Sequence, residues 1–390
     1  MDDKPLRIAM FTDNYYPFVG GVPNSIEKLS KGLRAKGHSV TVFCPKYPEQ
    51  TEPDTDPDIV RCKLLRYHKT KVYNFPLINI FSSSIRKEFL RRGFDVVHSH
   101  HPFWMGKKGH KLARKYGLPS VYTQHTMYDQ YSHYLPLLKG LFKKYIAHGI
   151  IRKFSQSCDA VFSPVGTSKT YLTSMGVTKP ISVMATGVDM VPRGAGDVFR
   201  ERYKPEQGVL LCSVARLAPE KNFHFMLKAI KRVTELTPAR FRCLIVGGGP
   251  DRASLDDAII ALGLSGVVTM IGEVPQPEVG RYLEASDFFV FASTSEVQGT
   301  VLYEAMAARC GAVSVYCSGA DDVIIDGFNG YRTHEDIEEW AARVASLLND
   351  PGEMRRLSDN AYEHAKQYSV EAMAEQAERT YRSVIGKRSG

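Results

Sequence analysis

Several features of common protein classes are missing from this sequence. No apolar run approaches the ~18 residues that a membrane-spanning helix needs. The first residues are polar and lead directly into an expected strand, so we expect no signal peptide. The seven cysteines show neither a Cys-x-x-Cys pair nor zinc-site spacing, and several fall in expected strands, which favours small core residues in a reducing cytoplasm. Dinucleotide-binding Gly-x-Gly-x-x-Gly, zinc-finger, RNP and helix-turn-helix signatures are also missing.

The size and the charge distribution give the first positive information. A chain of 390 residues is long enough for about two domains of ordinary size. Residues 1–195 carry 29 Lys and Arg against 14 Asp and Glu, a net charge of +15, whereas the remainder has a net charge of −6. Such an asymmetry suggests that one domain faces a polyanion, either nucleic acid or an anionic membrane surface. Because nucleic-acid signatures are missing, we favour the membrane surface and expect no nucleic-acid partner.

The pattern of the first half predicts an α/β domain. Residues 7–12 are expected to form a strand, Gly20 and Gly21 lead into a helix at 22–36, and another strand follows at 40–44. This order opens a doubly wound domain with a parallel sheet. The glycine pair allows the backbone to approach a ligand closely, although a plain tight turn would give the same residues.

Histidines follow two expected strands of this domain. Residues 95–98 lead to His100 and His101, and residues 120–123 lead to His125. Parallel sheets bind ligands at the carboxyl ends of their strands, so His125 is a candidate site residue, with a structural histidine as the alternative. The vicinal pair lacks a third ligand at suitable spacing, so we expect no metal there.

Two further segments of the first half have more than one interpretation. Residues 49–58 contain Asp-x-Asp pairs that could hold a metal on a diphosphate, but no apolar strand leads into them and prolines flank them. We therefore expect a solvated loop. Residues 135–156 mix apolar residues with lysine and arginine, as in a helix lying on an anionic membrane. An ordinary helix packed on the core is the alternative, and the basic charge of this half favours the membrane.

A second α/β series follows residues rich in proline and glycine. Its first strand, at 209–214, leads to Arg216 and Lys221, two cations that could neutralise a diphosphate without a metal. A surface ion pair with Glu220 is the alternative. The next strand, at 242–246, leads to a glycine triplet that includes Gly248 and again permits close approach of a ligand to the backbone.

Residues 287–311 combine a strand, a turn and a helix. Residues 288–292 form an apolar run typical of a buried strand, and residues 302–309 are expected to form a helix. The free amides near Thr300 and Val301 would favour a phosphate, while Glu296 and Glu304 could accept hydrogen bonds from sugar hydroxyls. Alternatively, Glu296 is a cap residue and Glu304 a solvated helix residue.

In this order and at these distances, the motifs resemble those of retaining glycosyltransferases of family 4, which have the GT-B fold. The residues that carry the resemblance are Gly20 and Gly21, His125, residues 186–189, Arg216 with Lys221, residues 247–250, and Glu296 with Glu304. The resemblance implies two Rossmann-like α/β domains facing a cleft. These would be an acceptor domain at 1–190, a linker at 191–208, a nucleotide-sugar domain at 209–367, and a C-terminal helix at 368–390 that returns to the first domain.

The resemblance also implies roles for individual residues. Glu304 would bind the ribose hydroxyls, Glu296 and His125 the donor sugar, and Arg216 with Lys221 the leaving diphosphate. The remaining donor-binding residues would be Gly20, Gly21, Gly248, Val274, Gly299, Thr300 and Val301. The family needs no metal and no cofactor. No residue pair is an evident nucleophile and base. For this fold the resemblance implies front-face attack by the acceptor hydroxyl, with the leaving phosphate taking its proton and with catalysis by positioning and charge stabilisation.

Three short stretches narrow the resemblance. Residues 12–17, 100–103 and 124–128 are similar to the subgroup that transfers glucose from UDP-glucose to diacylglycerol, while Val297 and Thr300 depart from its usual threonine and leucine. We therefore expect a cytoplasmic glucosyltransferase, peripheral on the inner face of the cell membrane. The alternatives are a same-fold enzyme using GDP-mannose, UDP-GlcNAc or UDP-galactose with phosphatidylinositol, a polysaccharide or an aminocyclitol, and a non-enzymatic nucleotide-sugar-binding module.

Overall fold

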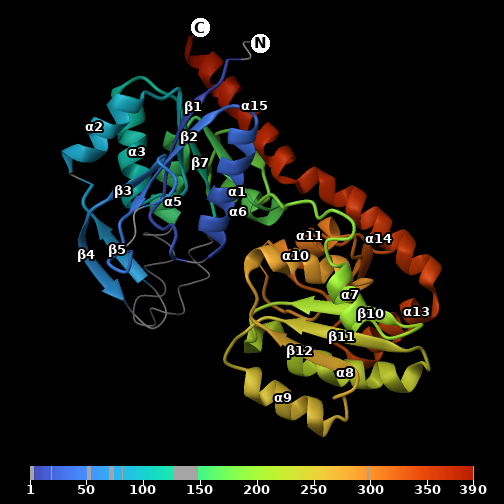
Figure 1. Cartoon of the computed structure of the whole chain (residues 1–390). Helices are drawn as coiled ribbons and strands as arrows, with labels where there is room; N and C mark the ends of the chain where they lie inside the picture. Colours follow the sequence, from blue (N-terminus) through green and yellow to red (C-terminus); the bar gives the residue numbers. More distant parts are fainter. Residues whose placement is uncertain are drawn as a thin grey trace. The chain divides into compact units, whose positions relative to one another are not determined.

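The computed structural model describes residues 4–18, 20–50, 54–69, 74–80, 82–125, 148–296 and 298–389. The chain divides into two compact units (Figure 1). Met1–Gly187 and Val370–Gly390 form the first unit, and Val188–Ser369 form the second. The first unit therefore contains both ends of the chain.

A seven-stranded parallel sheet forms the centre of the first unit, with the strand order β3-β2-β1-β6-β7-β8-β9. Its strands are β1 (Arg7–Phe11), β2 (Ser39–Pro45), β3 (Ile59–Cys62), β6 (Val96–Ser99), β7 (Ser120–Thr123), β8 (Ala160–Ser163) and β9 (Ile181–Val183). An antiparallel hairpin of β4 (Leu64–Lys69) and β5 (Asn74–Ile78), which the sequence analysis did not anticipate, follows β3.

Helices cover both faces of this sheet, because alternate residues of each strand point to opposite sides. The helices are α1 (Gly21–Ala35), α2 (Ser83–Arg92), α3 (Trp104–Lys115), α5 (His148–Ser157), α6 (Gly166–Ser174) and α15 (Val370–Ser389). Along β1, Ile8 and Met10 pack in the cluster that includes residues of α1 and α15, whereas Ala9 and Phe11 pack with residues of α2 and α3. The C-terminal helix α15 thus returns to the first unit and lies against α1 (Figure 1), as expected.

The second unit has a six-stranded parallel sheet with the order β12-β11-β10-β13-β14-β15. Its strands are β10 (Val209–Val214), β11 (Phe241–Val246), β12 (Val268–Gly272), β13 (Phe288–Phe291), β14 (Ala312–Val315) and β15 (Gly330–Thr333). Its helices are α7 (Asp197–Tyr203), α8 (Phe223–Leu236), α9 (Arg252–Ala261), α10 (Gln276–Ala285), α11 (Thr300–Ala307), α12 (Ser318–Asp321), α13 (Ile337–Asn349) and α14 (Pro351–Ala365), with 3-10 turns η4 (Pro219–Lys221) and η5 (Lys366–Tyr368).

The apolar run of β13 shows why this sheet is covered on both faces. Phe288 and Val290 pack in the cluster that includes α8 and α13, whereas Phe289 and Phe291 pack in the cluster that includes α10 and α11. A parallel strand between two helical layers has no solvent-facing side, so its sequence is apolar throughout.

Residues 191–208, which the sequence analysis expected to be a linker, are irregular only in part. They contain α7, whose Phe199 stacks on Tyr282 of α10 with ring centroids 4.0 Å apart. Arg200 of the same helix pairs with Asp287 at 2.6 Å. Aromatic stacking and an ion pair therefore attach this segment to the second unit.

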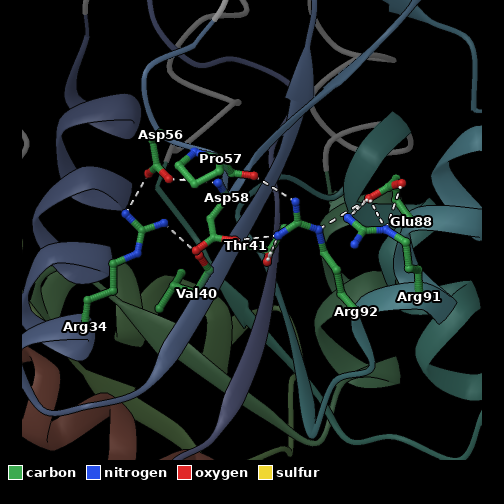
Figure 2. A network of polar contacts seen from close by, with 9 residues as sticks. All are labelled: Arg34, Val40, Thr41, Asp56, Pro57, Asp58, Glu88, Arg91 and Arg92. Carbon is green, nitrogen blue, oxygen red and sulfur yellow. Dashed lines mark hydrogen bonds and ion pairs between the residues drawn. The ribbon is translucent and has the colours of Figure 1, made fainter.

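The acidic loop before β3 is held by arginines. Each of its three aspartates has an arginine partner at 2.5–2.7 Å: Asp54 with Arg61, Asp56 with Arg34, and Asp58 with Arg92. Figure 2 shows that Arg34 and Arg92 also donate to the backbone carbonyls of Val40 and Pro57. The loop is partly exposed, as expected for a solvated loop, and ion pairs that the sequence did not predict attach it to α1, α2 and β3. The carboxylates balance arginine charge, and the described residues contain no group of His, Cys, Asp and Glu that could hold a metal ion.

Two other expectations concern the chain as a whole. Within the described ranges, no helix combines the length and apolar character needed to cross a membrane. All seven cysteines are buried and unbridged, as expected for small core residues.

Candidate active site

A pocket of about 550 Å³ lies at the carboxyl edge of the second unit's sheet. Its walls come from the ends of β10 and β11 with the loops that follow them, the loop after β12, α10 and the first turns of α11. The lining residues are Val214, Ala215, Arg216, Val246, Gly247, Gly248, Gly249, Glu273, Val274, Val279, Val301 and Glu304. This is the edge where open parallel sheets bind their ligands, and the volume falls in the usual range for small-molecule sites. The pocket includes four predicted donor-binding residues and the predicted catalytic Arg216.

The glycine triplet after β11 permits two loops of the pocket to touch. A Cβ on Gly247 would lie 2.0 Å from the carbonyl oxygen of Ala215, and one on Gly249 would lie 2.2 Å from that of Leu217. Both glycines have positive φ angles, and the Leu217 N–H donates to the Gly248 carbonyl at 2.8 Å. The backbone of the triplet therefore forms part of the pocket wall, which only glycine allows here.

Arg216 and Lys221 follow β10 and differ in their surroundings. Arg216 is largely exposed and pairs with Glu220 at 3.0 Å, an arrangement that contributes little stability. Lys221 pairs with Glu296 at 2.5 Å, and the two side chains are only 17% and 16% exposed. The structure thus joins two predicted catalytic residues that are 75 positions apart, a pairing that sequence spacing alone did not reveal.

Backbone contacts hold the Lys221–Glu296 pair in place. The carbonyl oxygen of Glu220 accepts hydrogen bonds from the Thr294 N–H and the Ser293 hydroxyl, each at 3.2 Å, and so joins the loops after β10 and β13. On the other side, the Ser318 hydroxyl donates to the Glu296 carbonyl at 2.6 Å. These contacts therefore fix both members of the pair within the site.

Helix α11 begins at this site with open backbone donors. Its N-cap, Gly299, has a φ of 60°, and no side chain of the described residues caps the helix. A Cβ on Gly299 would also lie 2.6 Å from the Gly319 carbonyl oxygen. An uncapped helix start favours an anion, because its first amides lack partners within the helix. Thr300 and Val301 form this first turn, as predicted.

The two remaining carboxylates of the pocket lie beside the helix start and the glycine triplet. Gln276 of α10 donates to Glu304 Oε1 at 3.3 Å, which places the Glu304 carboxylate on the pocket side of α11. Glu273 lies against Gly248, where an added Cβ would be 3.2 Å from Glu273 Oε2. Glu273 was not predicted as a site residue, although its place directly after β12 was a usable signal.

In the first unit, Gly20 and Gly21 stand at the start of α1. Gly20 is the N-cap in extended conformation, and a Cβ on Gly21 would meet no described atom within 4 Å. Packing among the described residues thus does not explain Gly21, and no described residue fills the space next to its Cα. This agrees with a backbone that a ligand can approach.

His125 lies at the carboxyl end of β7, as predicted, and contacts another histidine. Its Nε2 is 2.9 Å from Nδ1 of His100, which follows β6, and the two rings stack with centroids 5.2 Å apart. Burial lowers the pKa of both imidazoles well below the usual value, so both are neutral at pH 7. The His100 ring was not selected as a site residue from the sequence.

Asp13 is a third residue that was not selected from the sequence. Its Oδ1 accepts the Met105 N–H at 2.6 Å at the start of α3, and its own N–H donates to His101 Nδ1 at 3.1 Å. Burial raises the pKa of its carboxyl to about 7. The usable signal was its place directly after β1, at the same sheet edge as His125.

The predicted amphipathic helix at 135–156 lies largely outside the described residues. Its described part belongs to α5, where Ile151 and Phe154 pack against Tyr122 while Arg152 and Lys153 are exposed. For these residues, the apolar face covers the core, which is the alternative interpretation of the pattern.

Comparison with known proteins gives the same architecture. Residues 19–191 match the family model described as "Glycosyltransferase Family 4", and residues 197–364 match "Glycosyl transferases group 1". The alpha-monoglucosyldiacylglycerol synthase of Acholeplasma laidlawii is 30% identical, with 98% of each chain covered. The GDP-mannose-dependent alpha-mannosyltransferase of Mycobacterium tuberculosis is 28% identical over 82% of this chain and 81% of its own length.

Solved structures confirm the predicted fold class. The sucrose-phosphate synthase from Thermosynechococcus elongatus superposes with a TM-score of 0.74 at 18% identity, covering 98% of this chain and all of its own. Anabaena HepE, solved with UDP and glucose, gives a TM-score of 0.71 at 17% identity over 97% of this chain and all of its own. With two Rossmann-like parallel-sheet units, the protein is a nucleotide-sugar-dependent hexosyltransferase of the GT-B fold, and the chain belongs to the family 4 glycosyltransferases.

Proposed function

We propose that this protein transfers glucose from UDP-glucose, with retention of configuration, to the hydroxyl of diacylglycerol or a related glycerolipid at a membrane surface. The observation that carries the proposal is the Lys221–Glu296 ion pair beside the start of α11. It places a cation for a leaving phosphate and a carboxylate for sugar hydroxyls side by side. The full-length similarity to an alpha-monoglucosyldiacylglycerol synthase supports the choice of donor and acceptor.

The pocket of the second unit suits a nucleotide sugar. Glu304 would accept hydrogen bonds from the ribose hydroxyls, and the backbone of Gly248 and Val274 would border the nucleoside. The amides at Gly299, Thr300 and Val301 would bind the phosphates, since an uncapped helix start favours an anion. We propose that residues 209–367, which lie within this unit, form the nucleotide-sugar domain.

Arg216 and Lys221 would carry the charge of the departing diphosphate. In the transfer, the bond from the anomeric carbon to the phosphate oxygen breaks while the acceptor oxygen bonds to the same face of that carbon. The acceptor proton passes to the leaving phosphate oxygen. Two preorganised cations would stabilise the developing negative charge, so the reaction would need no metal and no further cofactor. Glu296 would orient the sugar by accepting its hydroxyl hydrogens.

The first unit would receive the acceptor. His125 lies at the carboxyl edge of its sheet and would contact the transferred sugar, while Gly20 and Gly21 would admit a ligand to the backbone. The excess of lysine and arginine in this part of the chain would hold the enzyme at an anionic membrane. We place it in the cytoplasm, peripheral on the inner face of the cell membrane.

A second candidate function uses the same site with another donor. The similarity to a GDP-mannose-dependent mannosyltransferase favours it. That relative is 28% identical to this chain, and the alpha-monoglucosyldiacylglycerol synthase is 30% identical. The acceptor would then be phosphatidylinositol, a polysaccharide or a soluble aminocyclitol. A non-enzymatic binding module is disfavoured, because all four of the charged residues expected for transfer are present. Arg216 and Glu304 line the pocket, and Lys221 forms the ion pair with Glu296.

A donor panel separates these candidates. Purified protein would be incubated in EDTA with labelled UDP-glucose, UDP-galactose, UDP-GlcNAc or GDP-mannose. Each donor would be offered with liposomes that contain diacylglycerol or phosphatidylinositol, and without liposomes. The proposal expects a glucosylated diacylglycerol from UDP-glucose. A mannosylated lipid from GDP-mannose would favour the second function. Products that form only when EDTA is left out would contradict the metal-independent mechanism.

A further inference from the structure

The pair of His100 and His125 has a defined hydrogen-bond direction. Each ring is neutral at pH 7 and therefore carries one N–H, and the nitrogens His100 Nδ1 and His125 Nε2 are 2.9 Å apart. One of these two nitrogens must donate and the other must accept. The direction decides which nitrogen of His125 holds its proton.

The surroundings of His100 favour one direction. The ring is 2% exposed, and its Nε2 is buried with no hydrogen-bond partner among the described residues. If His125 donated, His100 would carry its proton on this Nε2, leaving a buried N–H without an acceptor. If His100 donates through Nδ1, only a lone pair is left without a partner. Buried N–H groups without partners are the rarer of the two in folded proteins.

His98 packs against His100 and cannot change the direction of the hydrogen bond between His100 and His125. The His98 and His100 rings have centroids 4.2 Å apart. Both nitrogens of His98 are already used, because Nδ1 is 2.7 Å from the Tyr381 hydroxyl and Nε2 is 2.7 Å from the Thr123 hydroxyl. The His100 ring is thus fixed between His98 and His125.

We propose that His100 is a positioning residue that fixes His125 as the Nδ1–H tautomer, so that His125 offers a hydrogen-bond donor to an oxygen of the sugar substrate. Nδ1 of His125 makes no hydrogen bond to the described residues, while its Nε2 lone pair is occupied by His100. No lone pair of the His125 ring is then free to take a proton, so His125 acts as a donor and not as a general base. The identity of the ligand rests on the function proposed above, whereas the tautomer does not.

The tautomer can be measured without any substrate. Protein labelled with 15N-histidine would be examined by long-range 1H–15N NMR at pH 7.5, where protonated and bare ring nitrogens have well-separated shifts. The signals of His125 would be assigned by their loss in His125→Gln. The proposal expects a protonated Nδ1 and a bare Nε2. A protonated Nε2 on His125 overturns it, and this result needs no further variant.

Two variants of His100 then test its positioning role. His100→Asn keeps a donor near the position of Nδ1 and should preserve the His125 tautomer, whereas His100→Phe keeps the ring shape and should release it. His110→Phe is the matched control, because His110 is a half-buried histidine of the same unit bonded to Ser120. We expect kcat/KM for transfer to fall about tenfold in His100→Phe, with recovery in His100→Asn.

The outcomes separate the two proposals. An unchanged His125 tautomer in folded His100→Phe would overturn the positioning role, whatever the activity. If the wild-type protein shows the Nδ1–H tautomer but transfers no sugar, the proposed function fails while this inference stands. If His100→Phe does not fold, the wild-type spectrum and His100→Asn still decide the question.

Discussion

At the residue scale, the ion pair of Lys221 and Glu296 is the feature on which the proposed chemistry depends. Both side chains are about one-sixth exposed, so each charge is balanced mainly by the other. Removing one partner of such a pair leaves the other with an uncompensated charge in a partly desolvated place. A nucleotide sugar would supply both a phosphate for the lysine and hydroxyls for the glutamate. Ligand binding would therefore replace this contact with two new ones.

Replacement of Lys221 by alanine should remove most of the activity. We expect kcat to fall by roughly 10²–10³-fold, as when other preorganised charge-stabilising donors are removed, because the leaving diphosphate loses a cation. Steady-state kinetics with the donor found by the panel would measure the change. Lys228→Ala, on the exposed face of α8, is the control and should keep normal rates. Equal kcat values for the two variants would contradict the assigned role.

The buried carboxyl of Asp13 predicts a dependence of stability on pH. Burial raises its pKa in the folded state to about 7, above the ordinary value of 3.8. Between these values the folded protein holds a proton that the unfolded chain has lost, so stability falls as pH rises, by at most about 1.4 kcal/mol per unit. Asp13→Asn, which retains an oxygen for the Met105 N–H, should abolish this part of the dependence.

Thermal melts of wild type and Asp13→Asn at several pH values from 4 to 8 would test this prediction. The wild-type protein should lose stability relative to the variant across this interval. Two parallel curves would show that the Asp13 carboxyl titrates near its ordinary pKa in the folded state. The measurement needs no substrate and is independent of the proposed function.

At the scale of elements, much of the strand and helix order followed from the sequence. Apolar runs such as Phe288–Phe291, followed by glycine or polar residues, identified the strands and the ligand edge of each sheet. The β4–β5 hairpin and α7 were not predicted. The hairpin has two short strands, and α7 is a short helix in a segment rich in glycine and proline.

The candidate site was predicted less completely, for physical reasons. Residues of one loop, such as Gly299 and Thr300, are adjacent in sequence and could be selected together. The Lys221–Glu296 contact joins different loops, and the stacking of His100 on His125 joins different strands. Such contacts depend on strand order in the sheet, which the local pattern does not give. Selecting Asp13 from the sequence would have required knowing that its carboxyl is buried, because an aspartate in a loop is ordinarily exposed.

The glycine triplet gives a prediction for the loops of the pocket. In Gly247→Ala, the new Cβ would lie 2.0 Å from the Ala215 carbonyl oxygen, so the loops after β10 and β11 must separate. We expect a loss of about 1–3 kcal/mol in unfolding free energy and weaker binding of UDP. Gly263→Ala, also at positive φ but with no described atom within 4 Å, controls for backbone strain alone. Denaturant unfolding and UDP titration would measure both effects, and equal UDP affinity in the two variants would contradict the pocket assignment.

At the scale of the whole molecule, the two units differ strongly in charge. The first unit holds 32 Lys and Arg against 16 Asp and Glu, and the second holds 19 against 26. Their net charges are therefore +16 and −7. A glycerolipid acceptor must be reached at a bilayer, and basic residues near an anionic bilayer each contribute about 1 kcal/mol to binding.

This asymmetry predicts that vesicle binding depends on the first unit and on salt. Replacing the exposed Lys107 and Lys111 of α3 by glutamine should weaken binding to vesicles with anionic lipid, whereas Lys228→Gln and Lys231→Gln in the second unit should not. Cosedimentation at low and at high salt would measure the difference. Binding that is equal for neutral and anionic vesicles, or insensitive to salt, would contradict the electrostatic attachment.

The most direct test of the central claim is the lipid product made by the purified protein. Wild type and Lys221→Ala would be incubated with 13C-labelled UDP-glucose and vesicles of diacylglycerol with an anionic phospholipid, in EDTA, and the lipids analysed by mass spectrometry. We expect labelled glucosyl diacylglycerol from the wild type and roughly 10²–10³-fold less from the variant. No labelled lipid from folded wild type, or equal amounts from both proteins, would contradict the claim.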